Sequence, residues 1–133
     1  MFSLAISTSE FFFPFMYFLL SSLALMVRPF FVFGSEGQFS ERMHIFAKQF
    51  DRLKKENNIK SKCLVRKGRE KKETKLSKYK YLDVKKSPVV TNIYGKKLAL
   101  VFWTEEPEGI VIENEEVAKA YKSYFDILWK VAK

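Results

Sequence analysis

The stretch that decides the fold is residues 88–133, PVVTNIYGKKLALVFWTEEPEGIVIENEEVAKAYKSYFDILWKVAK. Residues 89–94 are rich in β-branched side chains, residues 97–103 are strongly apolar, and a Gly-Lys turn joins them. Two such runs across a tight turn predict a β-hairpin. The segment TEEPEG, residues 104–109, is turn-forming and leads into another short strand. This part of the chain is therefore expected to supply consecutive strands of one sheet.

The chain ends in an amphipathic helix. Asn114 is a good N-cap, and Glu115 and Glu116 complement the positive end of the helix dipole. Apolar side chains then repeat at i, i+3, i+4 and i+7, which predicts a helix that packs an aromatic stripe on the preceding strands. The stripe consists of Val117, Ala118, Tyr121, Tyr124, Phe125, Leu128, Trp129 and Ala132.

The middle of the chain adds a helix and further strands. Residues 30–33 are a short β-prone run, and apolar residues at helical spacing predict an amphipathic helix over residues 39–57. Residues 59–66 alternate as a strand does. Residues 67–80 are interpreted as a basic loop, followed by a brief extended piece around Tyr81. The expected fold is α/β, a small mixed sheet flanked by two amphipathic helices in a sandwich-like arrangement.

Residues 1–34 form a phenylalanine-rich hydrophobic leader, within which residues 11–27 are uncharged. As a helix this run would reach ~25 Å, just short of a ~30 Å hydrocarbon core. Three interpretations stay open: a membrane anchor, a buried helix or strand of the domain, or a leader that arises from a misassigned start. We divide the chain into this leader and a domain of residues 35–133. The domain is expected in the cytoplasm, or at the cytoplasmic face of the membrane if the leader is an anchor.

The whole net charge of +9 lies between Lys60 and Lys86, where twelve basic residues meet three acidic ones. Such an excess favours a nucleic acid or an anionic membrane surface, although a solvated loop would also explain it. The residues expected to contact an anion are Lys67, Arg69, Lys71 and Lys72.

Residue types that carry chemistry are scarce. Cys63 is the only cysteine and is expected to be buried and inert, which excludes a disulfide within the chain and fits a reducing compartment. His44 is the only histidine and lies off the apolar stripe of its helix. One histidine and one distant cysteine give no metal constellation, and no glycine-rich phosphate loop is present. The sequence therefore predicts neither an enzyme nor a cofactor.

Several motifs resemble one family. They are Asn92-Ile93-Tyr94-Gly95, the strand into Trp103, the Glu-Glu-Pro turn, Ile112-Glu113-Asn114, and Tyr124-Phe125 followed by Leu128-Trp129-Lys130. Together they resemble the C-terminal end of the archaeal sugar-specific transcriptional regulators of the TrmB family. The resemblance covers about residues 30–133 and implies a phospholipase-D-like effector domain. It also implies a homodimer, a small sugar-like ligand, and DNA contact only through a missing or separate domain.

The chain departs from the family pattern in two ways. No segment has the features of a winged helix-turn-helix. Phospholipase-D enzymes also need an HxKxxxxD motif with a nucleophilic histidine. When that pattern is laid on the hairpin, Ser87, Val89 and Tyr94 occupy the histidine, lysine and aspartate places. Cleavage of a phosphodiester by that route is therefore not expected.

We accordingly expect a non-catalytic effector and dimerisation domain of a TrmB-like regulator. The alternative is a membrane-tethered cytoplasmic module whose basic loop contacts anions or lipid. A ligand edge is expected at Tyr94, Trp103, Glu105 and Glu106, because an aromatic face beside carboxylates suits a polyol.

Overall fold

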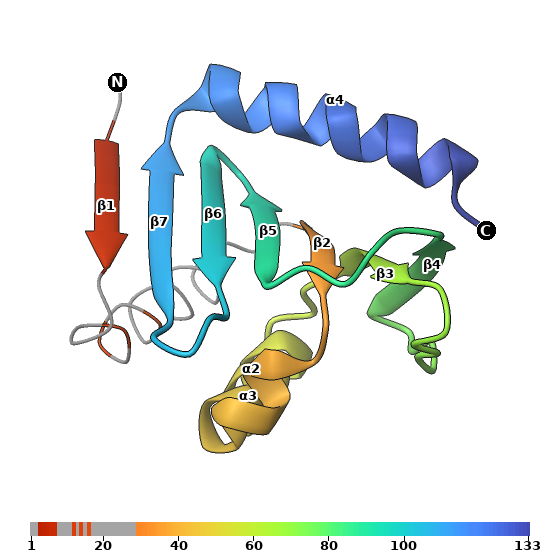
Figure 1. The fold of residues 1–133 in the computed structure, drawn as a ribbon, viewed down its shortest axis with the longest axis horizontal. Helices are drawn as coiled ribbons and strands as arrows, with labels where there is room; N and C mark the ends of the chain where they lie inside the picture. The colour runs from red at the N-terminus through yellow and green to blue at the C-terminus, as the bar shows by residue number, and fades with distance from the viewer. Residues whose placement is uncertain (1–2, 8–11, 13, 15, 17–28) are drawn as a thin grey trace.

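The computed structural model describes residues 3–7, 12, 14, 16 and 29–133. The strands are β1 (Ser3–Ser7), β2 (Phe30–Ser35), β3 (Ser61–Arg66), β4 (Ser77–Leu82), β5 (Val89–Tyr94), β6 (Lys97–Phe102) and β7 (Glu108–Glu113). The helices are α2 (Gln38–Arg42), α3 (His44–Glu56) and α4 (Glu115–Val131). The strands form one seven-stranded sheet in the order β1-β7-β6-β5-β2-β3-β4 (Figure 1).

The sheet has two halves with different connections. In one half β1, β7, β6 and β5 pair antiparallel, and the predicted hairpin is confirmed as β5–β6. In the other half β2, β3 and β4 run parallel. Parallel neighbours need a crossover connection, and α2 and α3 supply it between β2 and β3. The antiparallel pair β2–β5 joins the halves, so the sheet is mixed as predicted.

The helices cover opposite faces of the sheet (Figure 1). Helices α2 and α3 cover the face that carries Phe30, Val32, Val90 and Trp103. Helix α4 covers the other face, where Phe125 and Ala132 are buried against residues that include Leu64, Ile93 and Leu98. The molecule is thus a three-layer α/β/α arrangement, and alternate residues of each central strand face different helices.

The terminal helix begins as the sequence predicts. The Asn114 side chain accepts a hydrogen bond from the backbone N–H of Val117 at 3.1 Å, and its backbone is extended, as at an N-cap. The packing of the predicted stripe differs in part, because Tyr124 is 57% exposed. Phe125 instead contacts Phe31 and Trp129, with ring centroids 5.2 and 5.7 Å away.

Two predicted elements need correction. The single helix expected over residues 39–57 is two helices, because Met43 leaves helical geometry at φ −134° and ψ 51°. Met43 is buried, and the break turns its side chain into the core. The predicted basic loop also ends early, since β4 begins at Ser77. The alternation of lysine and tyrosine over residues 78–81 is a strand pattern, so the brief extended piece expected around Tyr81 should have been drawn to begin earlier.

Part of the leader belongs to the sheet. Strand β1 pairs with β7 from Ser3↔Glu113 to Ser7↔Gly109. Phe12 is 1% exposed and meets the Trp103 ring edge-on at 5.2 Å. The boundary expected between residues 34 and 35 falls inside β2. Most of the run 11–27 lies outside the described residues, so the three interpretations of the leader stay open.

Within the described part of the chain, no helix combines the length and the apolar character that crossing a membrane would need.

The fold predicts a contrast between a buried and an exposed residue of α4. Truncation of Phe125 to alanine removes a buried ring and leaves a cavity, so the free energy of unfolding should fall by about 3–5 kcal/mol. The control variant Lys130→Ala removes an exposed side chain and should change it by less than about 0.5 kcal/mol. Urea denaturation followed by circular dichroism measures both. Equal losses would show that α4 does not pack as described.

Candidate ligand-binding cavity

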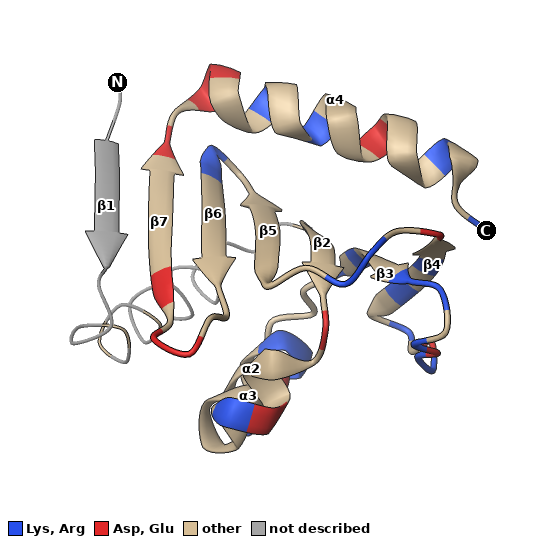
Figure 2. Ribbon diagram, in the orientation of Figure 1, with Lys and Arg blue, Asp and Glu red and all other residues tan. Residues whose placement is uncertain are grey.

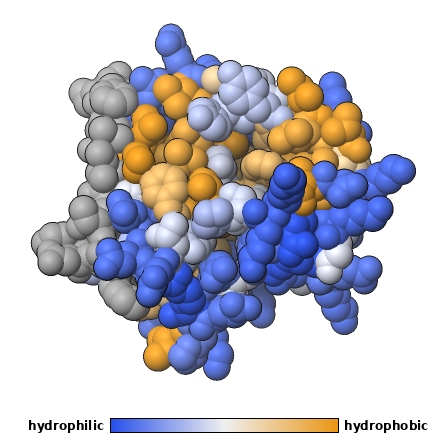
Figure 3. Space-filling view, in the orientation of Figure 1, coloured by the Kyte–Doolittle hydropathy of each residue, from blue (hydrophilic) through white to orange (hydrophobic). Residues whose placement is uncertain are grey.

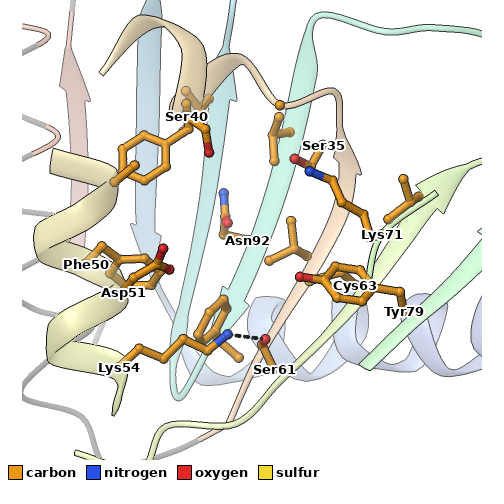
Figure 4. Close-up of a pocket in the computed structure, with 18 of the residues that line it drawn as sticks. Ser35, Ser40, Phe50, Asp51, Lys54, Ser61, Cys63, Lys71, Tyr79 and Asn92 are labelled. Carbon is orange, nitrogen blue, oxygen red and sulfur yellow. Dashed lines mark hydrogen bonds between the residues drawn. The ribbon is translucent and has the colours of Figure 1, made fainter. Parts of the chain in front are cut away.

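A cavity of about 230 Å³ lies between the sheet and helices α2 and α3. Its floor is formed by β2, β3 and β5, and its wall by the two helices (Figure 4). The aromatic side chains Phe30, Phe39, Phe50 and Trp103 line it. The Phe50 ring contacts those of Phe30 and Phe39 at 5.7 and 6.3 Å, so these walls are mutually packed.

Lys54 lies at one end of the cavity and is half-buried. Its Nζ donates to Ser61 Oγ at 2.8 Å and also to Ser77 Oγ. The two hydroxyls contact each other at 3.1 Å. The ammonium also lies 5.2 Å from the centre of the Phe30 ring. Among the described residues, no carboxylate lies within ion-pair distance of this ammonium.

Burial controls the acid–base properties of this end of the cavity. Loss of water lowers the pKa of Lys54, because desolvation disfavours the charged ammonium. The same cause raises the pKa of the Cys63 thiol and of Tyr79, which both line the cavity. Cys63 is therefore held as a neutral thiol, in line with the inert role expected for it.

The middle of the cavity carries an amide. The Asn92 side chain points from β5 into the open space (Figure 4). It makes no hydrogen bond to any described residue. Asp51 lies on α3, one turn before Lys54, and is the acidic residue among the described residues that line the cavity.

An ion cluster closes the opposite end. Arg66 donates two hydrogen bonds to Glu36, at 2.8 and 3.1 Å, and Arg69 Nε lies 3.5 Å from the same carboxylate. Arg69 also donates to the backbone carbonyl of Ser35. The Glu36 side chain is 6% exposed. The hydrogen bond from Arg66 and the two positive charges hold the pKa of Glu36 below its ordinary value.

Gly34 allows the chain to reach this cluster. Its φ is +86°, and a Cβ there would lie 2.6 Å from the carbonyl oxygen of Val89. The register of β2 against β3 shifts at this point, between Phe33 and Ser35. Glycine is therefore required for β2 to bend towards the rim of the cavity.

The structure separates the residues of the predicted ligand edge. Trp103 lines the cavity and is 7% exposed, with the Arg42 guanidinium 5.5 Å from its ring centre. Tyr94 is 1% exposed in the core and lies outside the cavity lining. Glu105 and Glu106 are exposed in the turn after β6, and neither lines the cavity.

The residues predicted to contact an anion are also divided. Lys67 and Lys72 are exposed between β3 and β4. Arg69 is occupied by Glu36, and both it and Lys71 line the cavity. Figure 2 shows Lys and Arg gathered on β3, β4 and their connection, as the charge distribution of the sequence suggests. Contact with an anion at these residues stays a prediction.

The residues at the positions aligned with the HxKxxxxD motif have structural roles. Ser87 Oγ accepts a hydrogen bond from the backbone N–H of Val89 at 3.1 Å, which fixes the start of β5. Tyr94 fills the core at the aspartate place. His44 is exposed at the start of α3 and does not line the cavity. Within the described ranges, no group of His, Cys, Asp and Glu is arranged to hold a metal ion.

Sequence reasoning missed Lys54, Ser61, Ser77 and Asn92. One signal was present, because Met43, Ala47, Phe50 and Lys54 follow one ridge of the helical repeat. The spacing predicts an apolar residue at position 54. A lysine there indicates that its ammonium is directed towards the sheet. The serines and the asparagine carry no comparable signal, since their position depends on strand pairing.

Solved structures show which fold this is. NucT from Helicobacter pylori matches with a TM-score of 0.79 at 10% identity, covering 99% of this chain and 98% of that one. Nuc from Salmonella typhimurium, a phospholipase D family member, matches with a TM-score of 0.60 at 10% identity, covering 100% and 97%. The archaeal chromatin protein TrmBL2 matches with a TM-score of 0.60 at 11% identity, covering 99% of this chain and 53% of that one.

These likenesses establish a phospholipase D-like fold and confirm the predicted fold class. The chain spans about half the length of TrmBL2, so the expected relation to TrmB-type proteins holds at the level of the fold. No protein-family model matches the sequence. No curated protein matches it either.

The ion cluster predicts an acid-dependent loss of stability. Glu36→Gln removes the charge that two guanidinium groups share and should lower the free energy of unfolding by about 1–3 kcal/mol at neutral pH. Because the pKa of Glu36 is lowered in the folded state, its contribution is present above the ordinary carboxyl pKa and is lost as pH falls through the lowered value. The difference between wild type and variant should therefore shrink in acid.

Glu56→Gln is the matched control, since Glu56 pairs with Arg52 at 3.6 Å on an exposed surface. It should change stability by less than about 0.5 kcal/mol at any pH. Urea denaturation at neutral and acidic pH measures both variants. A Glu36→Gln effect that is independent of pH would contradict the assigned role of the ion pairs.

Proposed function

We propose that this chain is a non-catalytic, ligand-binding effector domain with a phospholipase D-like fold, acting in a TrmB-like transcriptional regulator. The observation that supports the proposal is that the three positions aligned with the HxKxxxxD motif have structural roles. Ser87 and Val89 fix the start of a strand and Tyr94 fills the core. None of these three residues carries the nucleophilic imidazole that the HxKxxxxD chemistry needs.

The cavity supports the binding half of the proposal. It combines packed aromatic walls with a few polar groups directed inward, which is the usual composition of a small-molecule site. It lies under the α2–α3 connection, beside the strand pair that joins the two halves of the sheet. A ligand there would contact both helices and the sheet together, and could bias their arrangement.

A surface of α4 supports the expected homodimer. Four side chains of α4 are 37–67% exposed, namely Tyr121, Tyr124, Ile127 and Val131. Figure 3 shows apolar side chains gathered over the side of the molecule where α4 lies. We define these four residues as the α4 stripe. The helix is acidic at its start and basic at its end. Two copies that pair antiparallel would therefore bring opposite charges together at both ends of the stripe.

In this proposal DNA is reached only through another domain or another protein. TrmBL2, which is a chromatin protein with its own mode of DNA binding, is about twice the length of the part it shares with this chain. The basic surface around Lys67 and Lys72 is an additional candidate for contact with an anionic partner.

The absence of catalysis can be measured directly. Purified protein should not hydrolyse bis(4-nitrophenyl) phosphate or DNA faster than buffer does, because the histidine place of the HxKxxxxD pattern is a serine, Ser87. His44→Ala should give the same result, since His44 is exposed and outside the cavity. An activity that copurifies with the wild type and is lost in His44→Ala would overturn the proposal.

The dimer has a separate test. Ile127→Glu places a charge in the centre of the α4 stripe and should convert dimers to monomers in sedimentation velocity at micromolar concentration. Ile45→Glu is the control, because Ile45 is 61% exposed and lies on α3, on the opposite face of the sheet from α4. A wild type that sediments as a monomer, or a dimer that Ile127→Glu leaves intact, would contradict the assignment of the stripe.

A further inference from the structure

We propose that the cavity is a receptor site for a small organic anion, a phosphate ester or a carboxylate, whose charged group binds Lys54. The inference deepens the proposed function and rests on it, since it names the class of ligand that the effector site takes. The charge of the lining, the bonding of Lys54, and the size of the cavity each point to such a ligand.

The lining is positively charged. Among the described residues that line the cavity, Lys54, Arg69 and Lys71 are basic and Asp51 is acidic, which leaves an excess of two positive charges. Glu36 balances Arg69 from outside the lining. Lys54 and Lys71, which lie at opposite ends of the cavity, then stand against Asp51, so an excess of one positive charge remains. A neutral ligand would leave this excess uncompensated in a partly desolvated space.

The hydrogen bonds of Lys54 leave its positive charge available to an anion. Its partners, Ser61 and Ser77, are neutral hydroxyls, so the ammonium is held in place but not neutralised. Burial lowers the pKa of Lys54, and the charge of Asp51 on the same helix, which lies beyond ion-pair distance, offsets this only in part. A phosphate or carboxylate at this position would compensate the charge and form a charge-assisted hydrogen bond.

The rest of the cavity suits a short polar carbon skeleton. Asn92 offers one amide donor pair and one acceptor oxygen, and the rings of Phe30 and Phe50 provide apolar contact beside Lys54. A cavity of about 230 Å³ has the volume of roughly eight water molecules at ~30 Å³ each. A ligand of about ten non-hydrogen atoms fits this space. Glycerol 3-phosphate has this size and is a suitable probe.

Lys54→Met is the central variant. Methionine keeps an unbranched side chain of similar length and removes the buried charge, and Ser61 and Ser77 keep their mutual contact. The thermal midpoint of the variant should therefore be equal to or higher than that of the wild type. If Lys54 were only structural, its loss would lower the midpoint. The control is Lys55→Met, because Lys55 is exposed on the same helix and does not line the cavity.

Binding is measured by isothermal titration calorimetry with glycerol 3-phosphate, inorganic phosphate and glycerol. Wild type and Lys55→Met should bind glycerol 3-phosphate, with inorganic phosphate weaker and no binding of glycerol. Lys54→Met should bind at least about tenfold more weakly, the loss expected for one charge-assisted hydrogen bond. Asn92→Asp keeps the shape of the cavity, adds a negative charge to it, and should also abolish binding. It tests the proposal even if Lys54→Met does not fold.

The pH dependence gives a second readout. Binding should weaken as pH rises through the lowered pKa of Lys54. Among the described groups that face it, Cys63 and Tyr79 have pKa values that burial raises, and Asp51, Arg69 and Lys71 are the other charged side chains of the lining. In Lys54→Met this dependence should disappear.

The inference would be overturned if wild type bound none of these probes, bound glycerol as well as its phosphate, or bound equally well as Lys54→Met. Each of these results would leave the absence of catalysis intact. Hydrolysis of phosphodiesters would instead refute the proposed function, whatever the probes show, so the two failures can be told apart.

Discussion

The antiparallel pairing of β2 with β5 is the contact on which the rest of the structure depends. It joins a half built from hairpins to a half built from parallel strands. Because β2 must then continue to β3 in parallel, the chain has to cross over one face of the sheet, and α2 and α3 make that crossing. The cavity lies beneath this crossover. Its position therefore follows from topology rather than from any local motif.

Two regions of the fold carry different side chains. When the HxKxxxxD pattern is laid on the hairpin, its histidine place falls just before β5, where the Ser87 hydroxyl accepts a hydrogen bond from the backbone N–H of Val89. Under the crossover, by contrast, the chain keeps polar groups that the core does not use, Asn92 and the ammonium of Lys54. Structural contacts occupy the first region, and the second holds the polar groups on which the proposed ligand site depends.

The sequence predicted the elements whose signals are local. The hairpin, the Asn114 cap and the strand at β3 follow from turn residues and periodicity. The break at Met43 was not predictable, since the apolar spacing continues across it and tertiary burial decides it. Trp103 was placed in a ligand site by its chemistry, whereas its presumed partners Glu105 and Glu106 lie in an exposed turn. Lys54, Ser61 and Ser77 meet only through strand pairing between residues distant in sequence.

The central claim is that the partly desolvated ammonium of Lys54, beneath the crossover, is the binding site for an anion. The pKa of Lys54, followed by the ¹³Cε chemical shift in a pH titration with and without inorganic phosphate, tests this claim most directly. The account predicts a pKa below the ordinary lysine value of ~10.4 in the free protein and a rise when phosphate is added. An ordinary pKa that phosphate leaves unchanged would contradict it.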